Sequence, residues 1–495
     1  MLVPSTLSVV GIPIVEKRLY FLLTKYPPYS ILDLLFGTGG IFMNVAYTKQ
    51  LKVAIEKDLI VVGGGPAGFA AAVSAARNGA DVLLVERTAT LGGMATSGLV
   101  GPFMTSFAMD EKEQLVRGIF DELVRRMERR GSAIHPSKVR DRSPYCSYGD
   151  CSHANTTPFL SEDLAFMMDE MLAEAGAQCL FYTQVADVVA AQDGAVEYLI
   201  LNGKEGLFAA KAKVYIDCTG DADVAAFAGV PCIYGNGKGF AQPASLFFEV
   251  GNIDRNRYLA DIAEHIYEGG SFSWRVREAK QNGDWTLNRD YIGNYEQPTH
   301  GRYKINCSRV VGVDATNSHA LTKAHIAGRK QVQEIAAAMR KYIPGCEEMQ
   351  LLQVASSLGV RESRHIVGRY TLTVEDMQSS TVFEDAICSC AYALDIHQED
   401  ASSIFVMLDN PYSIPYRCLL PQNCDNLLVA GRCISGTSDA AGSYRVMPCC
   451  FALGEAAGAA AALALKDGVS PAEINVRTLQ QTLLAQGAYI KGISQ

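Results

Sequence analysis

A glycine-rich turn between two apolar strands constrains this chain more than any other feature. Residues 59–86 read LIVVGGGPAGFAAAVSAARNGADVLLVE. The β-branched run before the glycines is typical of a buried parallel strand, and the alanine-rich stretch that stops at Gly79 is typical of a helix. A second apolar strand, residues 81–86, ends in an acid. This order of strand, glycines, helix, strand and acid predicts an α/β unit with a parallel sheet.

Three glycines in the turn, Gly63, Gly65 and Gly68, have the spacing GxGxxG. Gly63 allows the tight turn, Gly65 lets a pyrophosphate approach the backbone, and Gly68 lets the helix pack closely on the strand. The free N–H groups at the start of the helix attract phosphate. Glu86 closes the second strand, where a carboxylate accepts hydrogen bonds from a ribose hydroxyl. The sequence therefore predicts a dinucleotide site.

Three later segments resemble parts of one flavin-binding arrangement. The pair Gly92–Gly93 follows the acid, and residues 213–230 predict a strand, a Thr-Gly-Asp turn and a short helix. Residues 426–465 predict a strand, the pair Gly431–Arg432 and a helix of small residues. In this order, they resemble the FAD-dependent oxidoreductases with a glutathione-reductase-type flavin domain. The start of such a last helix stabilises negative charge on a reduced flavin ring, although the small residues also fit simple close packing.

Four finer motifs are similar to one branch, the broad FAD-dependent oxidoreductase family. They are GVRESR at Gly359–Arg364, DIH at Asp395–His397, GRxIS at Gly431–Ser435 and GSxRVMP at Gly442–Pro448. The chain is also distantly similar to heterodisulfide reductase A-like flavoproteins, but it lacks their iron–sulfur cysteine clusters. The resemblance implies FAD as the cofactor. The cofactor-binding residues that it implies are Gly63, Gly65, Pro66, Ala67, Gly68, Glu86, Arg87, Gly92, Gly93, Met94, Ala95, Thr96, Val185, Thr219, Gly220, Asp221, Gly431, Arg432, Gly442, Ser443, Arg445, Val446 and Met447.

The predicted fold class is α/β, with a glutathione-reductase-type FAD/NAD(P)-binding Rossmann-like domain and an inserted α+β substrate domain. The flavin domain is expected at residues 43–234 and 411–495, and the substrate domain at residues 235–410. Residues 1–42 have no extended periodicity and no signal-peptide pattern, so we expect a disordered or mis-set N-terminal extension. Further helices are predicted at residues 113–130, 162–176, 319–343 and 479–487.

The densest polar stretch of the predicted substrate domain is residues 358–370, LGVRESRHIVGRY. If this stretch is a strand, Arg361 and His365 share one face. Arg361 can then clamp an anionic or carbonyl substrate, and His365 can move a proton while the flavin moves a hydride. An ion-pair network with Glu362 that holds the domains together fits the same residues.

Two further residues are candidates for the reaction. His397 lies two residues after Asp395, so the two side chains point the same way on a strand. We interpret His397 as an acid or base, and a histidine that anchors a loop is the alternative. Arg445 lies beside the expected flavin helix, where a cation contacts flavin or substrate. The predicted catalytic residues are therefore Arg361, His365, His397 and Arg445.

The sequence contains no second complete dinucleotide fingerprint, because GNGKG at residues 235–239 reads as a loop. The expected electron partner is therefore a small-molecule substrate or a separate electron-transfer protein. These observations predict an FAD-dependent oxidoreductase that transfers a hydride between a small organic substrate and flavin. Two alternatives are a partner-dependent electron-transfer or thiol–disulfide flavoprotein, and a flavin redox sensor without turnover.

Composition limits which binding partners and which cellular compartment we expect. The chain has 495 residues, a formal net charge of -9 and no run of Lys and Arg, which argues against nucleic acid. The apolar part of residues 1–42 is too interrupted to span a bilayer, so no membrane is expected. The 14 cysteines contain no CxxC pair, which predicts no metal site and a reducing cytoplasm. We interpret Cys146 with Cys151, and Cys449 with Cys450, as structural rather than redox-active.

Overall fold

The computed structural model describes residues 47–108, 110, 112–148, 154–265, 267–268, 270–400 and 402–493. The chain divides into two compact units, Met1–Gln50 and Leu51–Gln495. In the first unit, the described residues 47–50 are exposed and form neither helix nor strand. The extension predicted at residues 1–42 lies outside the described residues. All elements named below belong to the second unit.

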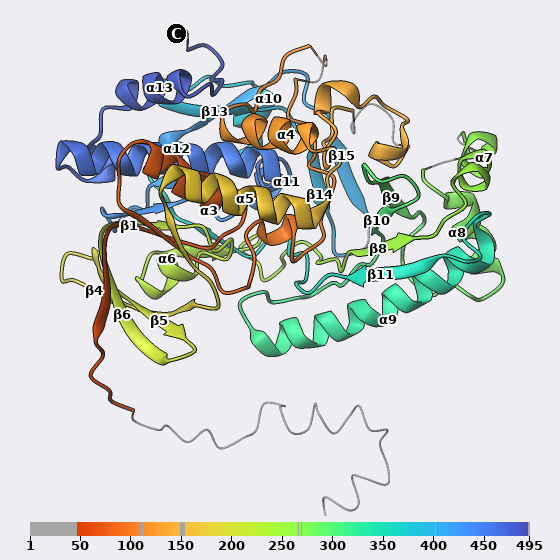
Figure 1. Cartoon of the computed structure of the whole chain (residues 1–495), viewed down its shortest axis with the longest axis horizontal. Coiled ribbons are helices and arrows are strands. Elements are labelled where there is room, and N and C mark those ends of the chain that lie inside the picture. The colour runs from red at the N-terminus through yellow and green to blue at the C-terminus, as the bar shows by residue number, and fades with distance from the viewer. Residues whose placement is uncertain are drawn as a thin grey trace, which may run out of the picture. The chain divides into compact units, whose positions relative to one another are not determined.

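A seven-stranded sheet organises the second unit (Figure 1). Its order is β3-β2-β1-β6-β5-β4, and β17 also pairs with β6. The strands are β1 (Val53–Val62), β2 (Val82–Val85), β3 (Gln178–Leu180), β4 (Gln184–Ala190), β5 (Val196–Gly203), β6 (Gly206–Asp217) and β17 (Leu427–Val429). The strands β1, β2, β3, β6 and β17 are parallel, whereas β4 and β5 pair in antiparallel fashion. The parallel part contains all the strands predicted around the glycine turn and the late segment.

Helices α3 (Pro66–Arg77) and α12 (Met447–Asp467) pack side by side (Figure 1). The approach is close because Gly454 and Gly458 have no side chains. A Cβ added to them would lie 2.0 Å from the Ala67 carbonyl oxygen and 2.1 Å from the Ala71 carbonyl oxygen. The small residues of the last helix therefore serve packing against the helix of the glycine motif. By length and composition α12 is the one described helix that could cross a membrane, and 83% of its apolar window is buried in this core.

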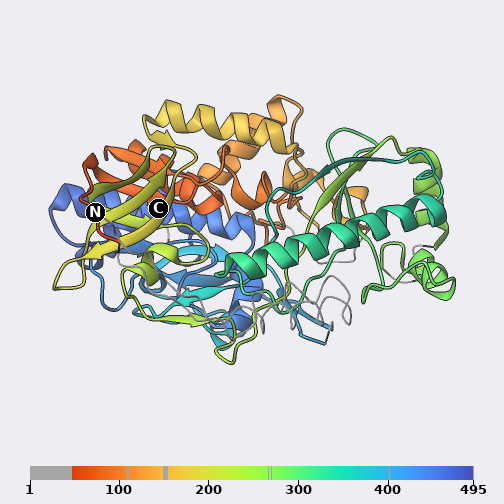
Figure 2. The same cartoon turned by 90° about the horizontal axis from the view of Figure 1, so that it is seen from below.

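A second sheet lies within the predicted substrate-domain segment. It has four antiparallel strands in the order β11-β8-β10-β9. They are β8 (Phe248–Gly251), β9 (Gly293–Glu296), β10 (Tyr303–Asn306) and β11 (Gln350–Val354). Helix α9 (Ser318–Tyr342) runs along this part of the unit (Figure 2). Phe248, Tyr303 and Ile335 belong to one hydrophobic core here, which is separate from the core around α3 and α12.

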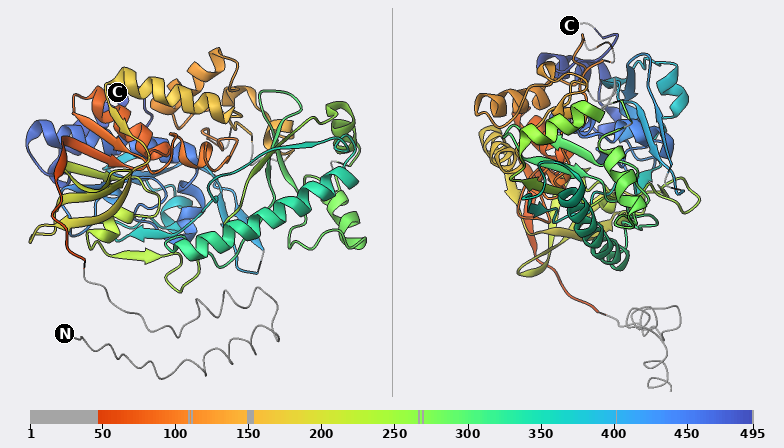
Figure 3. Two further views of the ribbon diagram at one scale, coloured as in Figure 1. Left: turned by 60° about the horizontal axis from the view of Figure 1, so that its bottom comes forward. Right: turned by 90° about the vertical axis from the view of Figure 1, so that its right-hand side faces the viewer.

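The helices predicted outside the glycine motif are present. They are α4 (Ile119–Arg129), α5 (Ser161–Ala175), α9 and α13 (Val476–Ala485). Helix α4 begins later than expected because Gly118 precedes it with a φ of 59°, outside the helical region. Helices α4 and α5 pack together, with α5 against α3 and α4 against α12 (Figure 3).

Short elements complete the unit. The other helices are α6 (Asp223–Phe227), α7 (Arg255–His265), α8 (Ser273–Gln281), α10 (Val374–Gln378) and α11 (Ser438–Tyr444), and single 3-10 turns occur at Gly93–Ala95, Pro136–Lys138, Pro144–Cys146, Tyr416–Leu419 and Pro471–Glu473. Three two-stranded sheets pair β7 (Cys232–Tyr234) with β12 (Arg364–Ile366), β13 (Ala386–Cys390) with β16 (Tyr412–Pro415), and β14 (Leu394–His397) with β15 (Ser403–Val406). These small sheets contain parts of the polar motifs at residues 359–397.

Glu455 is a buried acid within α12. One of its carboxylate oxygens accepts the backbone N–H of Ile119 at 3.1 Å, at the start of α4. Burial raises the pKa of Glu455 to about 8, although this N–H and Arg77 lower it. The pKa of the folded state therefore lies above the ordinary value of 4.5. Between these two pKa values the folded state holds a proton that the unfolded chain releases. The buried carboxyl therefore lowers the free energy of unfolding more and more as the pH rises from about 4.5 to about 8.

We expect Glu455→Gln to raise the free energy of unfolding by about 2–4 kcal/mol near pH 8, and by less than about 1 kcal/mol near pH 5. Denaturant unfolding of both proteins at the two pH values measures this difference. Glu122→Gln is the matched control, because pairing with Arg77 and Arg126 outweighs burial and lowers the pKa of Glu122. This control should lose stability near pH 8. Equal stability of Glu455→Gln and the wild type near pH 8 would contradict the proposed cost of the buried carboxyl.

Candidate active site

A cavity of about 1090 Å³ opens where the parallel strands end. Gly63 follows β1, Glu86 follows β2, Thr219 lies just past β6 and Gly431 just past β17, and all four line the cavity. Ligands of open α/β sheets bind at this carboxyl edge. The volume lies slightly above the usual range of about 300–1,000 Å³ for small-molecule sites, which suits a dinucleotide together with a substrate.

Most of the predicted cofactor residues line this cavity. They are Gly63, Gly65, Pro66, Ala67, Glu86, Arg87, Gly93, Met94, Val185, Thr219, Gly220, Asp221, Gly431, Arg432, Arg445, Val446 and Met447. Gly65 has surroundings that suit a bound ligand. Its φ of -69° suits any residue, yet an added Cβ would meet no atom within 4 Å. Its backbone borders open space beside the start of α3, where a pyrophosphate can bind the helix N-terminus.

Six predicted cofactor residues do not line the cavity, namely Gly68, Gly92, Ala95, Thr96, Gly442 and Ser443. They support its wall from behind. A Cβ on Gly68 would lie 1.7 Å from the Gly63 carbonyl oxygen, and the Gly92 N–H donates to the Gly64 carbonyl. Ala95 is in the core, and the Thr96 hydroxyl donates to a backbone carbonyl of its own loop. Gly442 and Ser443 lie inside α11, packed against residues 392–396.

Glu86 has a structural role besides the predicted one. Its Oε2 accepts the Gly64 N–H at 2.6 Å, and its Oε1 accepts the Thr88 N–H at 2.7 Å. The carboxylate thereby ties the glycine turn to the end of β2. Because a carboxylate offers about four acceptor positions, the ribose hydroxyl can still bind there.

Asp221 and Arg432 form an ion pair in the cavity wall, with 2.5 Å between Oδ1 and Nη2. The Ser363 hydroxyl also donates to Asp221 Oδ1, at 2.6 Å. Burial lowers the pKa of Arg432, but Asp221 outweighs burial, so the net shift is upward. This pair joins the Thr-Gly-Asp turn to the late segment, and Asp221 neutralises the charge of Arg432.

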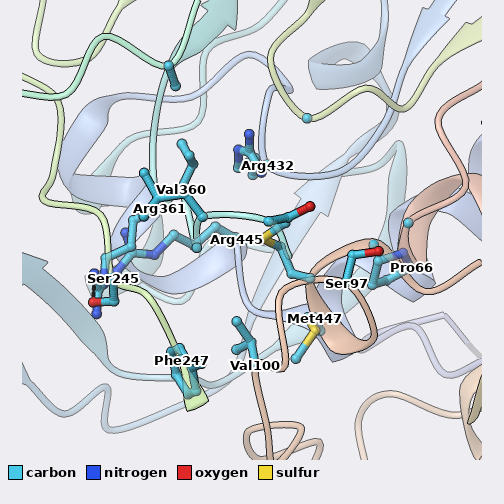
Figure 4. Close-up of a pocket in the computed structure, with 18 of the residues that line it drawn as sticks. Pro66, Ser97, Val100, Ser245, Phe247, Val360, Arg361, Arg432, Arg445 and Met447 are labelled. Carbon is cyan, nitrogen blue, oxygen red and sulfur yellow. Dashed lines mark hydrogen bonds between the residues drawn. The ribbon is translucent and has the colours of Figure 1, made fainter. Parts of the chain in front are cut away.

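Arg361 and Arg445 extend toward Ser245 in the same part of the cavity (Figure 4). Arg361 donates to the Ser245 hydroxyl at 2.9 Å and to a backbone carbonyl at 2.6 Å. Arg445 donates to a glutamine side chain at 3.0 Å and to the Asp395 carbonyl at 2.9 Å. Burial, with repulsion from Arg445, lowers the pKa of Arg361 to about 9. The two guanidinium groups therefore bind mainly neutral oxygens and are available to a ligand.

His397 also lines the cavity, but both of its ring nitrogens are occupied. Nδ1 lies 3.0 Å from the Ser403 hydroxyl and 3.4 Å from Nη1 of Arg309, and Nε2 lies 3.4 Å from Asp395 Oδ2. Because arginine only donates, Nδ1 accepts and Nε2 carries the proton. Burial, with repulsion from Arg361, lowers the pKa of His397 to about 4. The ring is neutral near pH 7, and this geometry favours a positioning role over the predicted acid–base role.

His365 does not line the cavity, so its predicted position is wrong. Its Nε2 lies 3.0 Å from Glu362 Oε1, and its Nδ1 lies 3.0 Å from the Tyr444 hydroxyl. The predicted shared face fails because β12 begins only at Arg364, which leaves Arg361 outside the alternation of the strand. His365 belongs to a buried network with Glu362 and Tyr444, in line with the alternative of a structural network given for this stretch.

Sequence reasoning missed several cavity residues from the inserted segment. Arg289 is 8% exposed, lies 4.6 Å from the ring centre of Tyr291, and its Nε has no hydrogen-bond partner among the described residues. His325 on α9 also has an Nε2 without such a partner in the described part of the chain, and burial lowers its pKa. Tyr295 and Tyr392 line the same cavity. No local motif marks these residues, because they reach the site only through the tertiary fold.

Three buried thiols form a cluster behind the cavity. The Sγ atoms of Cys388, Cys390 and Cys449 lie within 4.8 Å of one another, with 2.7 Å between Cys390 and Cys449. The CxC spacing at residues 388–390 is a signal that could have identified them, and three thiols are ligands that soft metal ions prefer. Cys450 lines the cavity, and burial raises its pKa to about 12, which makes the thiol unreactive. Cys151 lies outside the described residues.

The comparison with protein families decides the membership of this chain. A sequence model of the family described as FAD dependent oxidoreductase matches residues 58–483. The chain belongs to this family. The match runs from the first strand of the glycine motif to the last helix, and it confirms the predicted family and its cofactor, FAD. The cavity at the strand ends is the candidate site for this cofactor.

Individual relatives leave the substrate open. Thiamine thiazole synthase from Aeropyrum pernix is 33% identical over 143 residues, 29% of this chain and 43% of that protein. NADH oxidase from Thermoanaerobacter brockii is 39% identical over 56 residues, 11% of this chain and 9% of that protein. The chain thus matches less than half the length of either curated relative.

Solved structures of other flavoenzymes and reductase-like proteins are similar at a low level. A geranylgeranyl bacteriochlorophyll reductase-like protein from Thermoplasma acidophilum has a TM-score of 0.41 and 13% identity, covering 89% of this chain and 94% of that one. The p-nitrophenol 4-monooxygenase PnpA from Pseudomonas putida has a TM-score of 0.41 and 12% identity, covering 87% and 84%. At these values the likenesses do not identify a reaction.

Proposed function

We propose that this oxidoreductase transfers a hydride between FAD and a small organic substrate. The observation that carries the proposal is one continuous cavity that joins the open backbone at Gly65 to the guanidinium groups of Arg361 and Arg445. FAD, when bound, supplies the two-electron chemistry. The two arginines hold the substrate, because their present partners are mainly neutral oxygens that leave their charges available.

The side chains around the arginines indicate where the proton that the substrate loses can go. In the oxidative direction, the substrate loses a hydride from carbon with both electrons and a proton from an O–H or N–H group. His397 is a weak base, and its partner Asp395 has a pKa held well below its usual range by His397 and the arginines, which outweigh burial. Near neutral pH His397 stays neutral, with its single proton on Nε2, and Asp395 stays ionised, so neither stores the proton that the substrate releases and this proton passes to solvent in the cavity. The reverse transfer uses the same groups.

We also propose a domain assignment and a cellular compartment. Residues 43–234 and 411–495 form a glutathione-reductase-type flavin domain, and residues 235–410 form the substrate domain. The separate core of the second sheet supports this division, as do Arg289 and Tyr295, which this segment contributes to the cavity. The described cysteines are free, which supports a reducing cytoplasm. A separate electron-transfer protein is the proposed alternative partner.

We expect the purified protein to show the visible absorbance of bound flavin, and one class of small metabolites to bleach it without oxygen. Anaerobic mixing with a metabolite panel, followed by absorbance, makes this measurement. Chemically reduced protein mixed with the same panel tests the opposite direction. A protein that shows no flavin bands and binds no added FAD would overturn the proposal. Bands that no compound changes in either direction would favour the partner protein or the sensor.

A further inference from the structure

We infer that the substrate is a small anion with at least two negative charges, held by Arg289, Arg361 and Arg445. These residues are called the inner arginines below. The inference rests on the proposed hydride transfer and names its substrate class. All three line the cavity, and the electrostatic interactions of Arg361 with the other two place them in one group.

The charges in this part of the cavity do not balance. Asp395 lines the cavity and interacts with Arg361 and Arg445, with 3.7 Å between its Oδ2 and Arg445 Nη2. A fourth arginine, Arg309, lies behind His397, does not line this cavity and interacts with the exposed Asp400. Among the described residues that line this part of the cavity, the three inner arginines face one carboxylate, that of Asp395, which leaves a surplus of two positive charges.

The contacts of the inner arginines do not remove this surplus. Arg361 bonds a hydroxyl and a backbone carbonyl, and Arg445 bonds a side-chain amide and a backbone carbonyl. Arg289 is more than nine-tenths buried and stacks on Tyr291, with its Nε unpartnered among the described residues. Charges held away from water without a counter-charge are costly. A ligand that supplies two negative charges removes this cost.

The neighbouring groups are donors as well. Burial raises the pKa of Tyr295 and of Tyr392, so both hydroxyls keep their protons. Such hydroxyls can donate to anionic oxygens, and guanidinium forks match the two oxygens of a carboxylate or a phosphate. The wall therefore suits a dicarboxylate or a phosphate-bearing compound and gives a neutral substrate no compensation for the charges.

The cofactor's own phosphates do not account for the inner arginines. The pyrophosphate is expected beside Gly65 and Pro66, at the start of α3. In Figure 4, Pro66 and Ser97 lie at one side of the view and Arg361 lies at the other, with Met447 between them. The surplus charge is thus at the far end of the cavity from the phosphate-binding turn.

Binding to the FAD-loaded protein tests the inference without turnover. Calorimetric titrations with succinate, butyrate, butanol and inorganic phosphate compare two charges, one charge, no charge and a different anion. We expect succinate or phosphate to bind at least about tenfold more tightly than butyrate, and butanol not to bind measurably. Preference for succinate identifies a carboxylate substrate, and preference for phosphate identifies a phosphate-bearing one. Equal or absent binding of all four probes would overturn the inference.

Three variants locate the binding. Arg361→Gln and Arg289→Gln should each weaken dianion binding by about tenfold or more while FAD stays bound, and the second serves if the first does not fold. Arg257→Gln, at an exposed pair with Glu347, removes the same charge far from the cavity and should change nothing. Dianion binding that survives both inner variants would overturn the inference.

The same titrations separate this inference from the proposed function. A dianion that binds only FAD-free protein and is displaced by FAD would assign the inner arginines to the cofactor and overturn the inference. A protein that binds no FAD would already fail in the visible spectrum, before any anion is added, and that result concerns the proposed function. If a neutral metabolite bleaches the flavin of the FAD-loaded protein and no anion binds, the proposed hydride transfer stands and the anionic substrate is refuted.

Discussion

Replacing Gly65 with alanine is expected to abolish FAD binding while the apo-protein stays folded. The backbone at Gly65 has a φ of -69° and an extended ψ, which alanine adopts without strain. The new methyl group meets no protein atom within 4 Å, so it projects into the space beside the start of α3. A pyrophosphate must approach the backbone in that space. We expect the dissociation constant for FAD to rise by at least about a hundredfold.

Two glycine variants define what this result means. Gly131→Ala changes an exposed glycine with a φ of 75°, so it should cost about 1 kcal/mol of stability and keep full FAD binding. Gly68→Ala places a Cβ 1.7 Å from the Gly63 carbonyl oxygen, so it should damage the fold itself. Absorbance after reconstitution measures FAD, and thermal unfolding of the apo-proteins measures stability. Stoichiometric FAD in Gly65→Ala would show that the pyrophosphate lies elsewhere.

The glycine motif was predictable because its parts are contiguous. Strand β1, the turn at Gly63, helix α3, strand β2 and Glu86 follow each other within 34 residues, Val53–Glu86, and each has a local signature. The late segment was predictable for the same reason, since β17 and α12 flank one short motif. Their meeting in one cavity follows from the parallel pairing of β17 with β6. Local pattern and known topology were enough to predict that these segments meet in one cavity.

The substrate end was only partly predictable. Arg361 and Arg445 were found through motifs, but Arg289 belongs to a loop with no recognisable spacing and approaches them only in the fold. His365 was misplaced because the strand around it is only three residues long, paired with Cys232–Tyr234. Strand length is set by a partner more than 100 residues away in the chain, so the alternation of side chains in one segment could not reveal it.

The packing of the last helix is the point at which sequence reasoning left two explanations open, flavin contact and close packing. The helix does both at different places. Val446, Met447 and Cys450 at its start line the cavity, whereas Gly454 and Gly458 contact the backbone of α3. These functions are linked, because α3 begins at Pro66, beside the phosphate-binding space. We therefore expect the position of α12 to set the position of the glycine turn that precedes α3.

Gly454→Ala is expected to lower the free energy of unfolding by about 3 kcal/mol or more. Its Cβ would lie 2.0 Å from the carbonyl oxygen of Ala67, and the contacted atom is backbone, which no rotamer change can move. The sign of the effect is diagnostic, because alanine in place of glycine normally stabilises a helix interior by about 1 kcal/mol. Denaturant unfolding of the apo-proteins measures this change. Lys466→Ala, at the exposed end of the same helix, should change stability by less than about 0.5 kcal/mol.

The same variant tests the link between packing and cofactor. Ala67 both contacts Gly454 and lines the cavity, so pushing α3 away from α12 displaces the wall at the phosphate-binding turn. We expect the Gly454→Ala protein that remains folded to bind FAD more weakly, by about tenfold or more, although no atom of residue 454 faces the ligand. Gly458→Ala should cost similar stability, since its Cβ would lie 2.1 Å from the Ala71 carbonyl oxygen, but should affect FAD less, because Ala71 lies one turn further from the cavity. Equal FAD affinity in both variants and the wild type would show that the helix pair holds the fold together without setting the cofactor turn.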